Sequence, residues 1–258
     1  MTTWGYRKDN GPDTWHKSCP VATGERQSPI DLKDDTVKGG KFPPFSVSYP
    51  KLSSPKFCNN GHSVQYQADD SGNSTELSGG PLTEKYKFGQ FHFHWGAKDD
   101  EGSEHRVNGK MYPAELHLVH FKAKYAGIGE AVQSGDADGL CVLGFFLKVG
   151  AENASLKPIT DLLPKLKEPK SSEPVPASFD LKAILPSALT DYYTYEGSLT
   201  TPPLAQCVKW VVFKNPLEVS AAQMEAFRGV DDRFGNKMVG NYRPPCPLHS
   251  RTVSATFK

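Results

Sequence analysis

Three histidines in two short segments carry the clearest chemical signal in this sequence. His92 and His94 lie two residues apart in Tyr86–Trp95, and His117 lies in Ala114–Lys122. If both segments are β-strands, their side chains alternate between two faces, so His92 and His94 share a face at a spacing of roughly 6.6 Å. Antiparallel pairing of the two strands would place His117 across from His92 and His94, on the same face of the sheet. Three neutral imidazoles with one open position match the ligand set of catalytic zinc, because structural zinc sites use four protein ligands.

Polar residues on the same faces strengthen the prediction of a metal site. Gln90 and Glu115 each precede a candidate ligand by two residues, and a metal-binding imidazole needs an acceptor for its second nitrogen. A buried carboxylate without such a role would be costly. An H-x-H pair alone is more often two structural histidines, so it is the second segment and the two acceptors that favour the metal site. His105 and His120 fall off the ligand faces and are predicted to be structural.

The elements around these segments are predicted to be mostly strands with irregular connections, because prolines and glycines separate short β-branched and aromatic runs. The predicted strands are 46–49, 64–67, Tyr86–Trp95, Ala114–Lys122, Leu140–Val149 and 208–214. Residues 220–223 match a helix capping box, and 156–166 is weakly amphipathic but interrupted by two prolines. The proline-rich segment 165–176 is predicted to be a surface loop. Together these predict an α+β fold that is dominated by β-strands and forms one domain over 1–258.

Composition restricts the partners of the protein. The 258 residues include 30 basic and 29 acidic ones, a net charge of +1 that predicts no nucleic-acid or anionic-membrane partner and favours a small-molecule substrate. The longest apolar run, 140–147, is much shorter than the about 20 residues of a membrane-spanning helix. Five scattered cysteines without a C-x-x-C pair predict free thiols, and no secretory signal is visible. These features favour a cytoplasmic protein without a membrane span.

Nine motifs extend the signal along nearly the whole chain. They are Trp4-Gly-Tyr6, Asn10-Gly-Pro12, Gln27-Ser-Pro29, Asn59-Asn-Gly-His62, 90–96, Ser103-Glu-His105, 114–120, Ser198-Leu-Thr-Thr-Pro-Pro203 and Asn241-Tyr-Arg-Pro244. In this order they closely resemble the α-type carbonic anhydrases, in particular the animal cytosolic members. The resemblance implies a zinc-dependent lyase that reversibly hydrates carbon dioxide to bicarbonate through zinc-bound hydroxide, with a side esterase activity. It also implies a monomer that binds sulfonamide and anion inhibitors, and a large, mostly antiparallel twisted sheet with short surface helices.

The resemblance also assigns roles to individual residues. It makes His92, His94 and His117 the zinc ligands, and it makes Thr200 the residue that donates a hydrogen bond to Glu104 and accepts one from zinc-bound hydroxide. A carboxylate only accepts hydrogen bonds, so it would use the single donor of the threonine and leave a lone pair for the hydroxide. Substrate would lie against Thr200, Thr201 and an apolar wall made of Val119, Val142, Leu199, Val208 and Trp210.

Proton transfer would run through His62, whose ordinary pKa near 6.5 suits a group that exchanges protons near neutrality. The accompanying water path would involve Tyr6, Asn60 and Gln65. Gln65 departs from the asparagine of many relatives, and Ile128 lies at a variable rim position. Secreted relatives carry a disulfide at positions that match Ala22 and Leu204 here.

Two alternatives use the same residues differently. A catalytically silent relative would act as a binding module, but such proteins lack a zinc histidine, and all three are present here. A zinc hydrolase would also use a metal-activated water. No H-E-x-x-H motif occurs, which disfavours a zinc peptidase.

Overall fold

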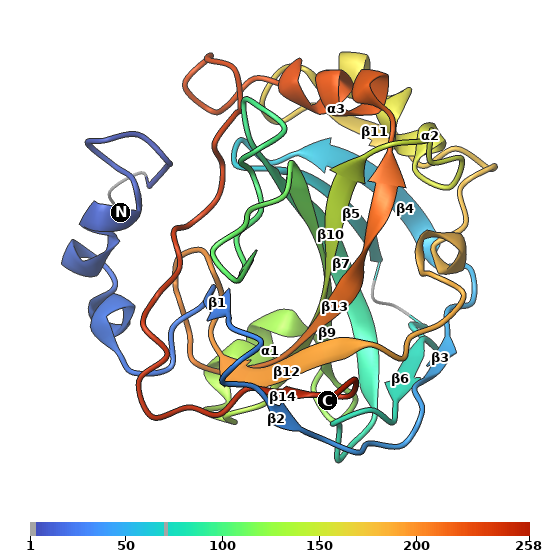
Figure 1. The fold of residues 1–258 in the computed structure, drawn as a ribbon. Helices are drawn as coiled ribbons and strands as arrows, with labels where there is room; N and C mark the ends of the chain where they lie inside the picture. Colours follow the sequence, from blue (N-terminus) through green and yellow to red (C-terminus); the bar gives the residue numbers. More distant parts are fainter. Residues whose placement is uncertain (1–3, 70–71) are drawn as a thin grey trace.

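The two histidine segments form neighbouring strands in the middle of a large twisted sheet (Figure 1). The computed structural model describes residues 4–69 and 72–258. Within these residues, twelve strands form the large sheet. Its main path is β11 (Ser172–Pro174), β4 (Ser53–Asn59), β5 (Val64–Asp69), β7 (Tyr86–Trp95), β9 (Ala114–Lys122), β10 (Leu140–Val149), β13 (Val208–Val219), β12 (Tyr192–Gly197), β14 (Ser254–Ala255) and β2 (Lys38–Gly39).

Most neighbouring strands of this sheet run antiparallel, as predicted, while β10–β13 and β14–β2 run parallel. Off this main path, β6 (Glu76–Ser78) pairs with the first residue of β7 and with β3 (Ser46–Ser48). A separate parallel pair joins β1 (Asp31–Leu32) to β8 (Arg106–Val107). The β-dominated α+β fold is therefore confirmed.

Short helices lie on the surface around the sheet. They are the 3₁₀ turns η1 (Pro12–Lys17), η2 (Pro20–Thr23), η3 (Leu163–Leu166) and η4 (Lys182–Ile184), and the α-helices α1 (Ile128–Gln133), α2 (Lys157–Thr160) and α3 (Ala221–Arg228). The predicted capping box is present at the start of α3, and the prolines of 156–166 occupy the first turns of α2 and η3. None of the helices in the described part of the chain is long and apolar enough to cross a membrane.

Two predictions differ from the structure by more than two residues. The segment 165–176 is not entirely a loop, because β11 pairs with β4 at the sheet edge, where a proline without an N–H is tolerated. The strand predicted to end at Lys214 continues to Val219. A register irregularity opposite Phe145–Leu147 accommodates Pro216, which cannot donate to a regular ladder.

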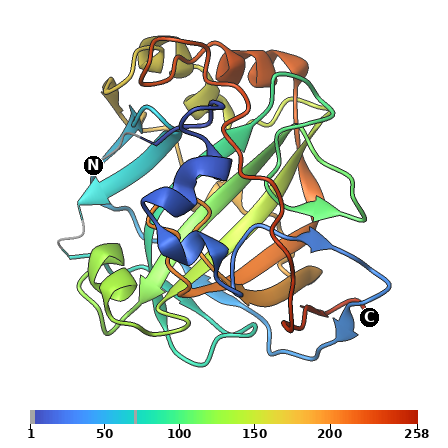
Figure 2. The ribbon, with the colours of Figure 1, turned by 90° about the vertical axis from the view of Figure 1, so that its left-hand side faces the viewer.

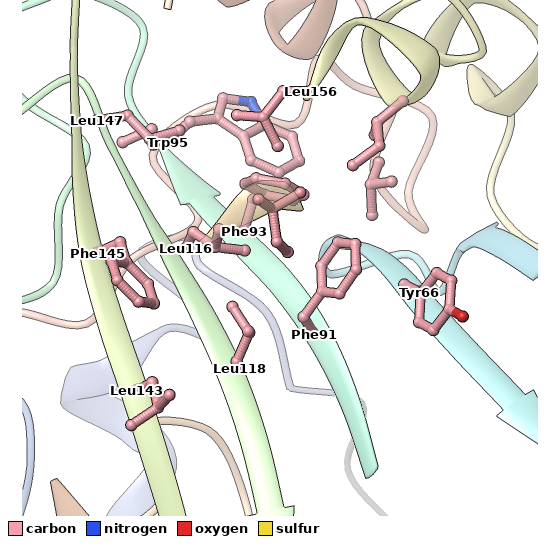
Figure 3. Close-up of a cluster of buried hydrophobic side chains, with 14 of the residues drawn as sticks. Tyr66, Phe91, Phe93, Trp95, Leu116, Leu118, Leu143, Phe145, Leu147 and Leu156 are labelled. Carbon is pink, nitrogen blue, oxygen red and sulfur yellow. The ribbon is translucent and has the colours of Figure 1, made fainter. Parts of the chain in front are cut away.

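Apolar side chains pack on the face of the sheet opposite the histidines. Phe91, Phe93 and Trp95 of β7 are fully buried there with residues from β9 and β10 (Figure 3). Earlier in β7, a register shift at Gly89 lets Phe88 reach the same core three residues before Phe91. A Cβ at position 89 would lie 2.5 Å from Ile128 Cδ1, so any larger residue there would push the Ile128 side chain aside.

The C-terminal segment closes the fold beside the N-terminal turns (Figures 1 and 2). The buried Arg243 guanidinium donates from Nη1 to Gln27 Oε1 and to the Ser28 backbone oxygen, both at 2.8 Å. These bonds connect residues more than 200 positions apart and place the chain around Asn241 next to β7.

Candidate metal centre

The strand register brings the three histidines together. β7 and β9 pair antiparallel with His92 directly opposite His117, and strand alternation places His94 on the same face. The ring centroids are 5.0 Å apart for His92–His94, 5.3 Å for His92–His117 and 4.7 Å for His94–His117. One nitrogen from each ring lies within 4.8 Å of the other two.

The second nitrogen of each ring donates a hydrogen bond to a fixed acceptor. His92 Nδ1 donates to Gln90 Oε1, and His117 Nε2 donates to Glu115 Oε1, each at 2.8 Å. His94 Nδ1 donates to the backbone oxygen of Asn241, also at 2.8 Å. A neutral imidazole has one donor and one acceptor nitrogen, so these bonds leave a lone pair on Nε2 of His92 and His94 and on Nδ1 of His117.

Electrostatics favours the neutral form of two of these rings. Burial lowers the pKa of His94, and burial together with the neighbouring histidines lowers the pKa of His92 well below its usual range. His94 Nε2 and Glu104 Oε2 are both buried without a hydrogen-bond partner and lie 3.4 Å apart. Burying two acceptors without donors is costly, and a cation bound at His94 Nε2 would satisfy its lone pair. Three imidazole nitrogens at this spacing fit a zinc ion.

The carboxylate of Glu115 accepts hydrogen bonds from other groups besides His117. Its Oε1 also accepts from His105 Nδ1 at 2.7 Å, and Oε2 accepts the backbone N–H groups of Glu104 and His105 at 2.9 and 2.8 Å. Burial alone would raise the pKa of Glu115, but His105 and His117 hold it well below the usual range. His105 itself is fixed by the Tyr195 hydroxyl, 2.6 Å from its Nε2. The histidine predicted to be structural therefore orients the carboxylate that orients His117.

The predicted apolar wall lies on the same face as His117. Val119 follows His117 by two residues on β9, and the register places Val142 opposite both Val119 and Trp210. The Trp210 ring lies 4.8 Å from the His117 ring at 68°. Val119, Val142, Val208 and Trp210 are buried in one cluster, and the partly buried Leu199 packs against it.

Glu104 lies at this centre, with Oε2 3.4 Å from His94 Nε2, and the described residues show no hydrogen bond between Glu104 and Thr200. Glu104 Oε1 accepts the backbone N–H of Arg243 at 2.8 Å, while Oε2 is the unpartnered atom. The Thr200 side chain is buried. The backbone oxygen of Thr201 accepts from the Leu204 N–H at 2.9 Å, which closes a turn that begins directly after Thr200.

Hydrogen bonds connect three of the predicted proton-path residues, Gln65, Asn60 and His62. Gln65 on β5 is opposite His92 and accepts from Asn60 Nδ2 at 3.1 Å, and Asn60 Oδ1 accepts the His62 backbone N–H at 2.9 Å. His62 and Tyr6 line a separate small cavity of about 160 Å³.

The environment of His62 differs from the sequence expectation. Its ring stacks on Trp4, with centroids 3.6 Å apart and planes 6° apart, and Arg233 Nη1 lies 3.2 Å from its Nε2. Burial and then the Arg233 charge lower the pKa of His62 to about 4 instead of the expected 6.5. Sequence patterns assigned no role to Asn241 or Arg233, because both reach the site through contacts between segments more than 140 residues apart.

The sequence is similar to those of known proteins along nearly its whole length. The sequence model of the family described as eukaryotic-type carbonic anhydrase matches residues 10–257. Carbonic anhydrase 7 of Homo sapiens is 45% identical over 263 residues, which cover 99% of this chain and 97% of the relative, and the Mus musculus protein of that name gives the same values. Carbonic anhydrase 3 of Mus musculus is 43% identical over 260 residues, covering 99% of this chain and 98% of the relative. The chain belongs to the eukaryotic-type carbonic anhydrase family.

Proposed function

We propose that this protein catalyses the reversible hydration of carbon dioxide to bicarbonate and a proton, with zinc held by His92, His94 and His117. The observation that carries the proposal is the convergence of three imidazole lone pairs, each fixed by a hydrogen bond at the opposite ring nitrogen. Family membership supports the assignment to the carbonate dehydratases, which are lyases.

A zinc ion held by His92, His94 and His117 would supply Lewis acidity and so lower the pKa of water at the site to about 7, a value for which carbonic anhydrase is itself the reference case. Gln90, Glu115 and the Asn241 carbonyl keep the three rings in the required tautomers. A carbon dioxide molecule is apolar, and the wall formed by Val119, Val142, Leu199, Val208 and Trp210 offers it an apolar surface beside His117.

We assign the orientation of the reacting oxygen to Thr200. Glu104 Oε2 has no donor and Oε1 is already occupied, so the carboxylate has one acceptor left for the Thr200 hydroxyl. A hydroxyl has one proton, so donation to Glu104 leaves its lone pairs facing the centre, where they accept from water. Thr201, the next residue in the chain, would contact bicarbonate beside Thr200.

Proton release is assigned to the imidazole of His62, with Asn60, Gln65 and Tyr6 ordering the intervening water. Asn60 supports this role because it bonds both the His62 backbone and the Gln65 side chain, which lies opposite His92. In this role His62 takes the proton from the site and passes it to solvent.

The remaining properties are proposed from the family and from the surface. A net charge of +1 suits a neutral substrate, and the five cysteines are free, as in a reducing cytoplasm. We propose a cytoplasmic monomer that sulfonamides and small anions inhibit at the metal centre. A side esterase activity would use the same activated water.

Stopped-flow carbon dioxide hydration tests the proposal, with zinc content measured on the same samples. The zinc-loaded wild type should be active, His117→Ala should lose both zinc and activity, and His16→Ala should retain both because His16 is exposed on η1. An inactive zinc-loaded wild type, or an active His117→Ala variant, would refute the assignment.

A further inference from the structure

His62 is held between two side chains from opposite ends of the chain. Its imidazole stacks on Trp4, and its Nε2 lies 3.2 Å from Arg233 Nη1. The Arg233 backbone N–H donates to the Gly61 oxygen at 3.1 Å, so the two loops are joined beside the imidazole. Gly61 has φ +83°, and a Cβ there would lie 2.8 Å from Arg233 Cβ. Glycine thus allows the Arg233 loop to approach the His62 loop closely.

The hydrogen bond with Arg233 selects one protonation state of the imidazole. A guanidinium has only donors, so Nε2 must accept with its lone pair, and the ring proton must be on Nδ1. A protonated imidazole has donors at both nitrogens and must break this bond. It would also place two positive charges side by side.

The other charged groups around His62 do not cancel Arg233. Asp232 favours the protonated ring, but its Oδ2 lies 3.8 Å from Arg7 and its Oδ1 accepts the Phe234 and Asn236 N–H groups. The titratable groups that line the adjoining cavity are Tyr6 and Arg7 of the N-terminal segment and Asp232 and Lys237 of the 231–237 loop. Burial of the ring acts in the same direction as Arg233 and disfavours the charged form.

We propose that Arg233 is a positioning residue that holds His62 neutral and stacked on Trp4, and that it thereby limits proton transfer in this enzyme. The inference rests on the proposed role of His62 as the group that carries the proton. His62 has a pKa of about 4, whereas the water that donates the proton has a pKa near 7. The equilibrium constant for this proton transfer is therefore unfavourable by roughly a thousandfold. Removing the Arg233 charge should therefore increase turnover.

The test compares zinc-loaded wild type with Arg233→Gln, which keeps a donor but removes the charge. NMR titration should show the His62 pKa rising by about one unit, because one adjacent charge shifts a pKa by about that much. In weak buffer, kcat should rise about three- to tenfold while kcat/KM stays constant, because only regeneration of the active site changes. The matched control is Lys237→Gln, whose lysine lines the same cavity and donates to the Gly229 oxygen, away from His62. It should change neither quantity.

Two further variants separate this proposal from the proposed function. In a His62→Ala/Arg233→Gln double variant the gain in kcat should disappear. An unchanged His62 pKa in Arg233→Gln would refute the claim that Arg233 keeps His62 neutral. Suppose instead that the His62 pKa rises in Arg233→Gln while kcat stays unchanged, and that His62→Ala alone lowers kcat. This result would refute the claim that Arg233 limits proton transfer. If His62→Ala leaves kcat unchanged, the proton-carrying role of His62 fails instead, while the raised pKa still supports the hold of Arg233.

Discussion

At the residue scale, the metal centre depends on which nitrogen of each imidazole is occupied. Spacing along a strand was enough to predict Gln90 and Glu115 as acceptors, because each lies two residues before its histidine. The acceptor for His94 is a backbone oxygen 147 residues away, and a backbone carbonyl leaves no signature in a sequence. The role of Arg233 could not be predicted for a similar reason, because it contacts His62 only where two loops distant in sequence meet.

Replacing Glu115 by glutamine should weaken zinc binding far more than it destabilises the fold. An amide has one acceptor oxygen, whereas the carboxylate accepts from His117, His105 and two backbone N–H groups. Changes of this kind cost about 10–100-fold in metal affinity. Zinc transfer to a chelator should accelerate accordingly in Glu115→Gln, and not in Glu225→Gln, whose side chain is exposed on α3. Equal dissociation rates in wild type and Glu115→Gln would exclude Glu115 as the partner of His117.

His120 should make folding stability pH-dependent. It is fully buried and neutral: its Nδ1 donates to the Leu118 oxygen at 3.1 Å, and its Nε2 accepts from the Tyr49 hydroxyl at 2.5 Å. Burial lowers its pKa from 6.5 to about 4, so the unfolded chain binds this proton first. The contribution of neutral His120 to the free energy of unfolding is complete above pH 6.5. It is lost as the pH falls towards 4, at about 1.4 kcal/mol per pH unit.

Urea unfolding at several pH values checks this contribution. The free energy of unfolding of His120→Gln should fall less steeply than that of wild type between pH 6.5 and 4, whatever its absolute value. Parallel curves for the two proteins would mean that His120 is not held neutral.

At the element scale, β-branched and aromatic runs predicted the strands that carry the site, but β12 and β4 were missed. β7, β9 and β10 match the predicted bounds. β12 was not predicted; it has only six residues, the first four of which are buried. β4 was not predicted either, because its exposed, polar first half becomes a strand through pairing with β5.

The α3 cap stabilises the helix that covers the back of β7. Ser220 Oγ accepts the Gln223 N–H at 3.2 Å, and Phe227 of the helix packs 4.8 Å from Phe93 and 5.3 Å from Trp95. Ser220→Ala should lower the free energy of unfolding by about 1 kcal/mol, whereas Ser220→Asp should retain most of the stabilisation that the cap provides. The urea midpoint should shift without a change in slope, and zinc affinity should stay constant. Equal stability of Ser220→Ala and wild type would contradict a role for this cap.

At the scale of the whole molecule, the metal centre lies on one face of a sheet whose other face is packed independently of it. The core behind β7, β9 and β10 is formed by aromatic and aliphatic side chains (Figure 3). The class of fold followed from strand-like runs, but closure by Arg243 could not be predicted, because it joins residues at opposite ends of the chain.

Zinc removal should therefore leave the sheet intact. The three ligands belong to two adjacent strands that backbone pairing and the opposite core already hold together. Circular dichroism of the metal-free protein should match that of the zinc-loaded protein, while the urea midpoint falls because bound zinc stabilises only the folded state. Loss of the β-sheet spectrum on chelation would make the site structural instead.

Titration of this metal-free protein with zinc, while carbon dioxide hydration is followed, tests the central claim most directly. Activity should rise linearly from a negligible level and stop rising at one zinc per chain, because the three converging nitrogens form one site with an open position. The triple variant His92→Ala/His94→Ala/His117→Ala should stay inactive throughout. Activity that does not depend on zinc, or an equal rise in the triple variant, would contradict the account.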